Sequence, residues 1–261
     1  MKRLSIAEIE AKLDTILDDS NPFLEELGND ERKGVQRCLT KWKRQREQEK
    51  KLQVKFDEMN HFERKCRAEG FRFIAGIDEV GRGPLAGPVV AAAVILPGDF
   101  YLAGIDDSKK LSEKRRQEYD IIIRREAIAY SISMIHADVI DEINIYEATK
   151  KAMNAAVASL KPNPDFLLID AMKLETPYPS ESIFKGDAKS ISIAAASIVA
   201  KVARDELMKE LSITYPDYGF QQNMGYGTKE HIDAIKQFGI TSYHRKSFAP
   251  VKDYMKILYS K

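Results

Sequence analysis

The 261-residue sequence has few cysteines, no long apolar run and almost no net charge, and each of these absences excludes something. Only Cys38 and Cys66 occur, without metal-ligand spacing between them, which favours a reducing compartment and two unpaired thiols. The longest apolar run, residues 89–96, is too short to span a bilayer, and no apolar core of the signal-peptide kind follows Met1. We therefore expect a soluble cytoplasmic protein with no membrane partner.

Nucleotide-cofactor enzymes have glycine-rich phosphate loops and many zinc proteases have an HExxH spacing, and this sequence contains neither. The formal net charge of +1 argues neither for nor against a polyanionic partner. The charge is uneven, however: residues 5–30 carry eight acids and one lysine, whereas residues 31–65 carry twelve lysines and arginines against six acids. The basic segment is a candidate for gripping nucleic acid, and a solvated helix face is the alternative.

Two domains are expected, a helical N-terminal extension over residues 1–70 and a larger domain over residues 71–261, which includes the C-terminal helices. Ser5 and Glu8 form the capping-box pattern of a helix start, and Asn21 followed by Pro22 marks a second start. A long polar helix over residues 30–68 is expected to end before Gly70. It carries two apolar stripes, one of Val35, Leu39 and Trp42, and one of Leu52, Phe56, Met59, Phe62 and Cys66.

From residue 71 onward the pattern changes to alternating strands and helices. Two adjacent strands come first, and strands then alternate with helices, which indicates an α/β fold with a mixed sheet flanked by helices. We expect strands over residues 71–77, 88–96, 128–136, 166–169 and 182–184, and helices over residues 112–127, 138–160 (in two pieces), 189–211, 228–238 and 250–258.

The run from Asp78 to Gly83 is the richest in candidate chemistry. Asp78 and Glu79 follow the first strand, and carboxylates at a strand end can hold a hard cation such as Mg²⁺ or Mn²⁺. Gly81 and Gly83 flank Arg82 and let backbone N–H groups approach a ligand closely. Neighbouring residues in a strand point to opposite faces, so either the strand ends before the acid pair or one of the two acids is structural. Gly81 indicates that the strand ends there. The pattern suggests metal-assisted chemistry on a phosphate polymer, and an exposed acid pair in a turn is the alternative.

Two further acids are candidates for the same site. Asp170 follows four apolar residues of a strand that should be buried, where a carboxylate is costly unless it is paired or bound to metal. Asp187 is either a site residue or the N-cap of the helix that begins near residue 189.

The stretch from Asp78 to Pro84 resembles the first motif of ribonuclease HII, a type 2 ribonuclease H. The resemblance continues through most of residues 71–250, with six further segments in the expected order. They are Asp107-Ser108-Lys109-Lys110-Leu111, the run from Leu167 to Asp170, Lys185-Gly186-Asp187, the run from Ala194 to Asp205, Gly225-Tyr226-Gly227-Thr228 and the run from His244 to Phe248.

The resemblance implies a ribonuclease H-like fold and an endoribonuclease. Its substrates would be RNA in RNA–DNA hybrids and duplex DNA that contains single ribonucleotides, and the products would carry 5′-phosphate and 3′-hydroxyl ends. A monomer is expected. The implied catalytic and metal-binding residues, which would bind Mn²⁺ or Mg²⁺, are Asp78, Glu79, Asp170 and Asp187.

The same resemblance implies the substrate contacts. The loop of Gly81, Arg82 and Gly83 would read the ribose 2′-hydroxyl, the group that distinguishes RNA from DNA. Tyr226 would stack on the sugar beside the cleavage site, and packing over the following helix is its alternative. Ser108, Lys109 and Lys110 precede a helix start and would suit phosphate oxygens. Lysines on a solvated loop are the alternative.

Several alternatives stay open at this point. Ribonuclease HIII has a similar catalytic core but usually carries a β-rich N-terminal domain, whereas residues 1–70 here are predicted to be helical. A nucleic-acid-binding module with a dead site is the second alternative, and a glycosidase with paired carboxylates is the third. The basic run of His244, Arg245 and Lys246 is a candidate nucleic-acid contact. Lys201 and Arg204 either contact the backbone of a nucleic acid or form structural ion pairs.

Overall fold

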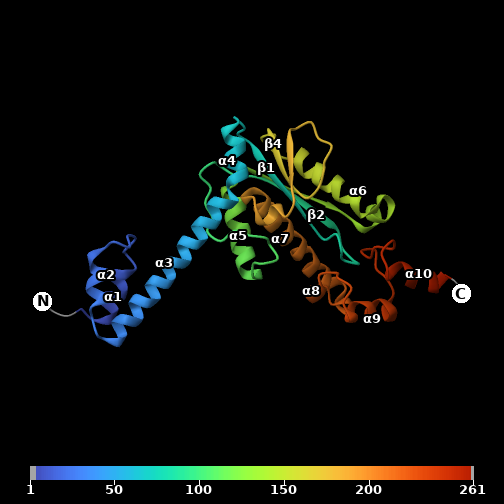
Figure 1. The fold of residues 1–261 in the computed structure, drawn as a ribbon. Coiled ribbons are helices and arrows are strands. Elements are labelled where there is room, and N and C mark those ends of the chain that lie inside the picture. Colours follow the sequence, from blue (N-terminus) through green and yellow to red (C-terminus); the bar gives the residue numbers. More distant parts are fainter. Residues whose placement is uncertain (1–3, 260–261) are drawn as a thin grey trace. The chain divides into compact units, whose positions relative to one another are not determined.

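The computed structural model describes residues 4–259 and divides into two compact units, one ending at Lys55 and one beginning at Phe56. The second unit contains a mixed five-stranded sheet with helices on its faces (Figure 1). In chain order the elements are α1 (Ile6–Leu13), α2 (Pro22–Gly28), α3 (Lys33–Met59), α4 (His61–Ala68), β1 (Ile74–Val80), β2 (Val89–Ile95), α5 (Glu113–Glu126), β3 (Ala129–Ile135), α6 (Ala137–Ala158), β4 (Phe166–Asp170), β5 (Ser180–Ile183), the short 3₁₀ turn η1 (Gly186–Ala188), α7 (Ile191–Thr214), the 3₁₀ turn η2 (Pro216–Tyr218), α8 (Phe220–Asn223), α9 (Lys229–Phe238) and α10 (Val251–Tyr259).

The first unit has a small core of its own. The capping box at Ser5 and Glu8 is confirmed, since each residue's side chain accepts a hydrogen bond from the other's backbone N–H. Pro22 begins α2 as expected, with Asn21 as its N-cap. The first apolar stripe of α3 packs against α1 and α2. The core of this unit includes Ile9, Leu13, Phe23, Leu27, Val35, Leu39 and Trp42.

The expectation of one continuous helix over residues 30–68 is wrong, because α3 and α4 are separated at Asn60. This residue has ψ near 8°, outside the regular helical range, and asparagine is a poor helix former. The break has a packing reason. Phe56 and Met59 join the cluster on the α7 side of the sheet, whereas Cys66 of α4 joins a separate cluster with Ile74.

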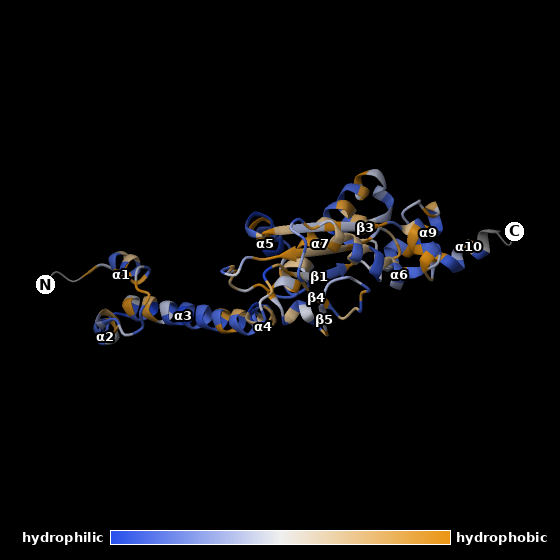
Figure 2. Cartoon of the chain, turned by 90° about the horizontal axis from the view of Figure 1, so that it is seen from above, coloured by the Kyte–Doolittle hydropathy of each residue, from blue (hydrophilic) through white to orange (hydrophobic). Residues whose placement is uncertain are grey.

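Along the chain, the boundary between the two compact units falls within α3, before the change of sequence pattern near residue 70. Residues 56–68 belong to the second unit because their apolar side chains are buried in its core. Figure 2 shows α3 mostly in the hydrophilic colour, as expected for its charged middle section.

The sheet has the strand order β3-β2-β1-β4-β5. β1 pairs antiparallel with β2 and parallel with β4, and β2 pairs antiparallel with β3. The mixed sheet flanked by helices predicted from the sequence is therefore confirmed. α6 is interrupted at Asn144, which has a φ of 68°, so its prediction as two pieces is also confirmed.

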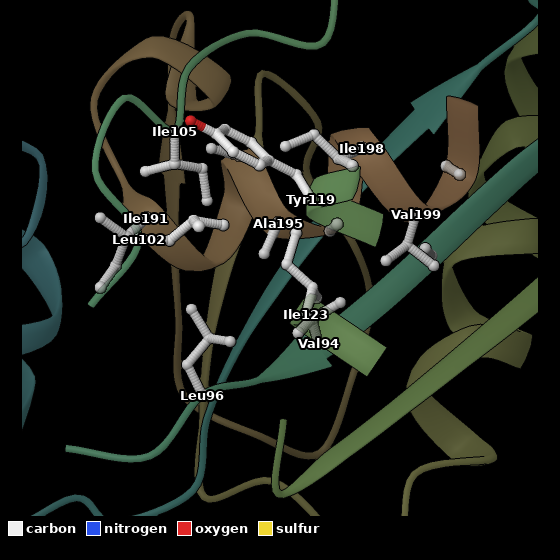
Figure 3. Packing of buried hydrophobic residues seen from close by; sticks show 14 of the residues in the cluster. Val94, Leu96, Leu102, Ile105, Tyr119, Ile123, Ile191, Ala195, Ile198 and Val199 are labelled. Carbon is white, nitrogen blue, oxygen red and sulfur yellow. The ribbon is translucent and has the colours of Figure 1, made fainter. Parts of the chain in front are cut away.

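The two faces of the sheet are covered by different helices. α6 packs on the face that carries Ala91, Ala93 and Ile95, and α7 packs with α5 on the face that carries Ala92 and Val94. Figure 3 shows the second of these clusters, where side chains of β2, α5 and α7 interdigitate.

Close approach of α7 to β1 depends on a glycine. A Cβ at Gly76 would stand 2.0 Å from the carbonyl carbon of Ser192, closer than real Cβ contacts allow. The small residues of both elements thus let the α7 backbone lie against the strand that carries the acid pair.

The C-terminal part of the second unit is built around a buried histidine pair. The Nε2 atoms of His231 and His244 lie 3.0 Å apart, and the rings pack against Tyr218 and Phe220. Burial lowers the pKa of His231, and burial together with the neighbouring His231 lowers the pKa of His244 to about 4. Both rings are therefore neutral at pH 7.

Within residues 4–259, no helix combines the length and the apolarity that crossing a membrane would require.

We predict that the histidine pair makes the fold sensitive to mild acid. The unfolded chain takes up protons near the ordinary histidine pKa of about 6.5, whereas folded His244 does not until about pH 4, so folding loses stability as the pH falls below about 6.5. Between pH 7 and pH 5 the loss should approach roughly 2 kcal/mol in the free energy of unfolding. Urea denaturation at a series of pH values measures it.

The matched comparison is between His244→Gln and His61→Gln, since His61 is exposed. The buried variant should lack most of this acid sensitivity, and the exposed variant should retain it. If His244→Gln and wild type lose stability in parallel on acidification, the histidine pair is not the cause.

Candidate active site

β1 carries the acid pair inside the strand rather than after it. The expectation that the strand ends before Asp78 is wrong, because Val80 still pairs with Val90 of β2. The turn begins at Gly81, where φ is +88°. Asp78 lies opposite Ala92, on the α7 face, and Glu79 lies opposite Ala91, on the α6 face. The two carboxylates therefore start from opposite faces at the end of one strand.

Asp170 ends β4, the parallel neighbour of β1. Ile77 pairs with Ile169, so the two following residues, Asp78 and Asp170, lie at the same edge of the sheet. The Asp170 carboxylate accepts a 2.6 Å hydrogen bond from the backbone N–H of Gly186. This bond ties the end of β4 to the turn that carries the next acid.

Asp187 lies on the 3₁₀ turn η1 and does not cap α7. Ser190 is the N-cap, and its hydroxyl accepts a hydrogen bond from the backbone N–H of Ile193. The N-cap alternative for Asp187 is thus excluded. Its carboxyl group interacts electrostatically with Asp170 and hydrogen-bonds with Asp107, a residue for which no separate role was expected.

The side chains of Asp78, Glu79, Asp170 and Asp187, hereafter the carboxylate cluster, all have raised pKa values. Burial is the largest cause in each case. For Asp78, which is almost fully buried, the pKa rises well above its usual value, and the charges of Glu79 and Asp170 add to the effect of burial. Gathering negative charge away from water disfavours ionisation, and a nearby cation would relieve this cost.

Lys109 supplies one cation to the cluster. Burial alone would lower the pKa of its ammonium group, yet the surrounding carboxylates raise it above the usual value, with Asp107 contributing most, followed by Asp78 and Asp187. Lys110 behaves differently and forms an ion pair with Asp106 at 3.2 Å.

Ser108 is buried and lies behind the cluster. Its hydroxyl is 2.9 Å from that of Ser197, which also hydrogen-bonds with the Asp78 carboxylate. Of the three consecutive residues expected to contact phosphate, the structure therefore places Lys109 among the acids, Ser108 beneath them and Lys110 beside Asp106.

The donor chemistry of the carboxylate cluster fits a hard divalent cation. All four side chains offer oxygen atoms, which Mg²⁺ and Mn²⁺ prefer. The Oε2 atom of Glu79 is buried without a hydrogen-bond partner, and a buried oxygen in this state is costly unless a ligand binds it. In the part of the chain that the structure describes, no three acidic, histidine or cysteine side chains already form a metal site. The fit therefore rests on charge and donor type.

The glycine loop lies beside these acids, together with Tyr226. Arg82 forms an ion pair with Glu79 at 3.3 Å, and its side chain is 44% exposed. A Cβ at Gly83 would meet only the Tyr226 ring, at 3.6 Å, whereas a Cβ at Gly81 would stand 2.3 Å from Nε of Arg204. The loop and the half-exposed tyrosine thus form one surface, although they are far apart in the sequence.

The basic run at the C-terminus does not form an exposed patch, and that expectation is wrong. His244 and Arg245 are buried, the first against His231 and the second against backbone carbonyl groups, and only Lys246 is exposed. Basic residues in a row normally remain solvated, so no local pattern signalled this burial.

Lys201 forms a structural ion pair, one of the two alternatives considered for it, whereas Arg204 has structural contacts that are not ion pairs. Lys201 pairs with Asp205 at 2.6 Å. Arg204 is fully buried and donates hydrogen bonds to the carbonyl groups of Ala86, Pro88 and Met224. Its place in an alanine-rich helix was the only signal of burial in the sequence.

Known families and individual proteins resemble this chain along nearly its whole length. The family described as Ribonuclease HII matches residues 75–251, and that described as Ribonuclease HII N-terminal domain matches residues 5–67. The chain is 56% identical to Ribonuclease HII of Bacillus thuringiensis (strain Al Hakam) over 253 residues, which cover 97% of this chain and 98% of the relative. It is 56% identical over 256 residues to that of Bacillus anthracis (strain CDC 684 / NRRL 3495), covering 98% and 100%.

Solved structures share the fold. Ribonuclease H2 from Pyrococcus horikoshii OT3 aligns with a TM-score of 0.62 at 24% identity, covering 72% of this chain and 99% of that one. RNase HII from Archaeoglobus fulgidus, solved in complex with PCNA, gives 0.58 at 27%, covering 67% and 95%. Bst-RNase HIII in complex with Mn²⁺ gives 0.53 at 18%, covering 73% and 71%.

We predict that the carboxylate cluster binds Mn²⁺ and that Asp170→Asn weakens this binding by about tenfold or more, because one hard anionic oxygen is lost. Isothermal titration calorimetry with Mn²⁺ at neutral pH measures the change. Asp120→Asn is the matched control, since Asp120 is also a buried acid with a raised pKa but pairs with Arg124 at 2.8 Å. Equal Mn²⁺ affinity in the two variants would remove Asp170 from the metal site.

Proposed function

Since the chain belongs to the ribonuclease HII family, we propose that the carboxylate cluster is the catalytic site of a metal-dependent endoribonuclease. Family membership makes the protein a type 2 ribonuclease H, hence a nuclease and a hydrolase. One observation supports the assignment of the site above all. Acids from three separate segments, at the ends of β1 and β4 and on η1, converge on one edge of the sheet, where each raises the cost of ionising another.

The proposed substrates are RNA in RNA–DNA hybrids and duplex DNA that contains single ribonucleotides. The arrangement of the glycine loop supports this choice, because Arg82 of the loop pairs with Glu79, and the Tyr226 ring is the only group near the Cβ position of Gly83. A backbone that lies open at this point can donate hydrogen bonds to a ribose 2′-hydroxyl, which DNA lacks. An aromatic ring beside it can pack on the sugar of the neighbouring nucleotide.

Residues of the carboxylate cluster would hold Mg²⁺ or Mn²⁺, which would activate water and neutralise charge on the phosphodiester. The relative solved with Mn²⁺ supports this proposal. Lys109 lies among the carboxylates and would offer its ammonium group to a phosphate oxygen. Arg82, held beside Glu79 but partly exposed, would do the same for the adjoining phosphate. The products would carry 5′-phosphate and 3′-hydroxyl ends.

A monomer would suffice for this chemistry, because all the proposed site residues come from one chain. We place the enzyme in the cytoplasm, since both cysteines are buried and unpaired, as suits a reducing compartment. Duplex binding would gain from the first unit, where Arg37, Lys41 and Arg44 follow one another at helical spacing on α3. Backbone phosphates are the natural partners of such a basic stripe.

The direct test is a cleavage assay on duplex DNA that carries one ribonucleotide, with all-DNA and RNA–DNA hybrid duplexes alongside. Asp78→Asn should lower cleavage in Mg²⁺ by about 10³-fold or more, equivalent to roughly 4 kcal/mol of transition-state stabilisation, while substrate binding is largely retained. Asp120→Asn should cleave as wild type does. Near-normal turnover by Asp78→Asn would remove Asp78 from the catalytic site.

Gly83→Val tests whether the loop reads the ribose. The added side chain fits the fold, because only the Tyr226 ring lies near, but it would obstruct the approach of a sugar to the backbone. We expect a loss of about tenfold in kcat/KM on the single-ribonucleotide duplex, the value of one good hydrogen bond. The loss should be smaller on the hybrid, which offers many 2′-hydroxyl groups.

Gly98→Val provides the control for inserting a valine at an unhindered glycine, since only Nε of Arg67 lies near its Cβ position, at 3.7 Å. This variant should cleave both substrates normally. Unchanged activity of Gly83→Val on the single-ribonucleotide duplex would show that the loop does not read the ribose.

A further inference from the structure

Arg245 is a fully buried arginine that the proposed chemistry does not use. Its side chain is 0% exposed, and Asp141, the carboxylate among residues 4–259 that acts on it electrostatically, forms no ion pair with it. Burial, with a smaller effect of the nearby Arg204, lowers the pKa of its guanidinium to about 9, so it keeps its charge at neutral pH. A buried charge without a carboxylate partner is costly and must be balanced by other contacts.

Those contacts are carbonyl groups of the glycine loop. Nη2 of Arg245 donates to the carbonyl oxygen of Gly81 at 2.6 Å, and Nη1 donates to that of Arg82 at 2.9 Å. Nε and Nη2 both donate to Gly87, at 3.1 and 2.8 Å. The Phe248 ring lies 5.0 Å from the guanidinium carbon and completes its surroundings. One planar group thus gathers both ends of the loop.

Because the peptide bond is planar, holding a carbonyl group also fixes the direction of the N–H group in the same peptide. In a planar trans peptide the C=O and the following N–H point in opposite directions. The carbonyl of Gly81 shares its peptide with the N–H of Arg82, and the carbonyl of Arg82 shares its peptide with the N–H of Gly83. Because Arg245 draws both carbonyls inward, both N–H groups point away from it.

The two N–H groups are available for a ligand. Within the described part of the chain, neither the N–H of Arg82 nor that of Gly83 has an acceptor, whereas those of Leu85, Ala86 and Gly87 bond to Gly225 and Tyr243. Both of these N–H groups belong to peptides whose carbonyl groups Arg245 holds.

The other buried arginine holds a different part of the loop. Arg204 donates to the carbonyl groups of Ala86 and Pro88, which end the loop, and to that of Met224. It contacts neither carbonyl that shares a peptide with the two free N–H groups. Arg204 packs against Gly81, but the hydrogen bonds that hold these two carbonyl groups come from Arg245.

We propose that Arg245 is a positioning residue for ribonucleotide recognition: it holds the Gly81 and Arg82 carbonyls so that the N–H groups of Arg82 and Gly83 face the ribose. The proposal rests on the proposed function, in which this loop reads the 2′-hydroxyl. A lysine could not replace Arg245, because an ammonium group lacks the planar fork that reaches several carbonyls at once.

Binding measurements in EDTA, where no cleavage occurs, test the proposal with full-length protein. Two duplexes of identical sequence are compared by fluorescence anisotropy, one all-DNA and one with a single ribonucleotide. Arg245→Lys should lower the preference for the ribonucleotide duplex by about tenfold, the value of roughly one lost hydrogen bond, without changing the affinity for the all-DNA duplex. A purely structural role would weaken binding to both duplexes alike.

Lys246→Ala is the matched control, since Lys246 is the exposed neighbour of Arg245, and it should keep the wild-type preference. If Arg245→Lys does not fold, as judged by thermal unfolding, Arg245→Gln replaces it and the same outcomes decide. A preference that is unchanged in the folded variant would overturn the proposal. So would a wild-type enzyme that cleaves the single-ribonucleotide duplex but binds both duplexes equally.

Failure of the proposed function has a different signature. A wild-type protein that does not cleave the single-ribonucleotide duplex in Mg²⁺ or Mn²⁺ would contradict that function whatever Arg245 does. If the wild-type protein cleaves the single-ribonucleotide duplex and binds it in preference to all-DNA, and Arg245→Lys keeps this preference, only the positioning role is contradicted.

Discussion

The parallel pairing of β1 with β4 is the constraint on which the active site depends. Because Ile77 pairs with Ile169, the acids that follow them, Asp78 and Asp170, come to the same edge of the sheet. The approach of α7 then sets where Asp187 stands, since η1 leads directly into that helix. Gly76 permits this approach by leaving room for the backbone at Ser192. A change in strand register would separate the carboxylates without altering any of them.

Placing the carboxylates of the cluster close together and away from water costs free energy, and the fold partly offsets this cost. Burial raises the pKa of each acid in the cluster, so the acids retain protons more readily than free carboxylates do. The ammonium group of Lys109 offsets part of the negative charge of the cluster. The Oε2 atom of Glu79, which has no hydrogen-bond partner, shows that the offset is incomplete. Divalent cations would supply what is missing. The carboxylate cluster is thus suited to binding cations, and bound cations would in turn attract a polyanionic substrate.

Around this site, the last third of the chain serves as a frame for the glycine loop. Arg204 comes from α7 and Arg245 from the segment before α10, and each donates only to backbone carbonyl groups of the second unit. His244, which precedes Arg245 in sequence, belongs to the neutral histidine pair, whose rings pack against Tyr218 and Phe220. A basic C-terminal run would suggest electrostatic contact with nucleic acid. In the structure, the two buried arginines instead hold backbone carbonyl groups in place, whereas Arg82, Lys109 and Lys246 remain accessible.

The sequence by itself determined most of the elements and the class of fold, and it indicated the acids that we propose for the catalytic site. Apolar periodicity located the strands and helices, and the run from Asp78 to Gly83 indicated both the chemistry and the family, because local patterns report local structure. Only the tertiary structure decided how β1 continues past its acids, why the long helix breaks at Asn60 and what the basic residues near the C-terminus contact. These outcomes depend on pairing with β2, on separate packing clusters and on carbonyl groups more than a hundred residues away. Arg245 and Lys246 are adjacent and both basic, yet one is buried and one is exposed, and contacts that are distant in sequence distinguish them.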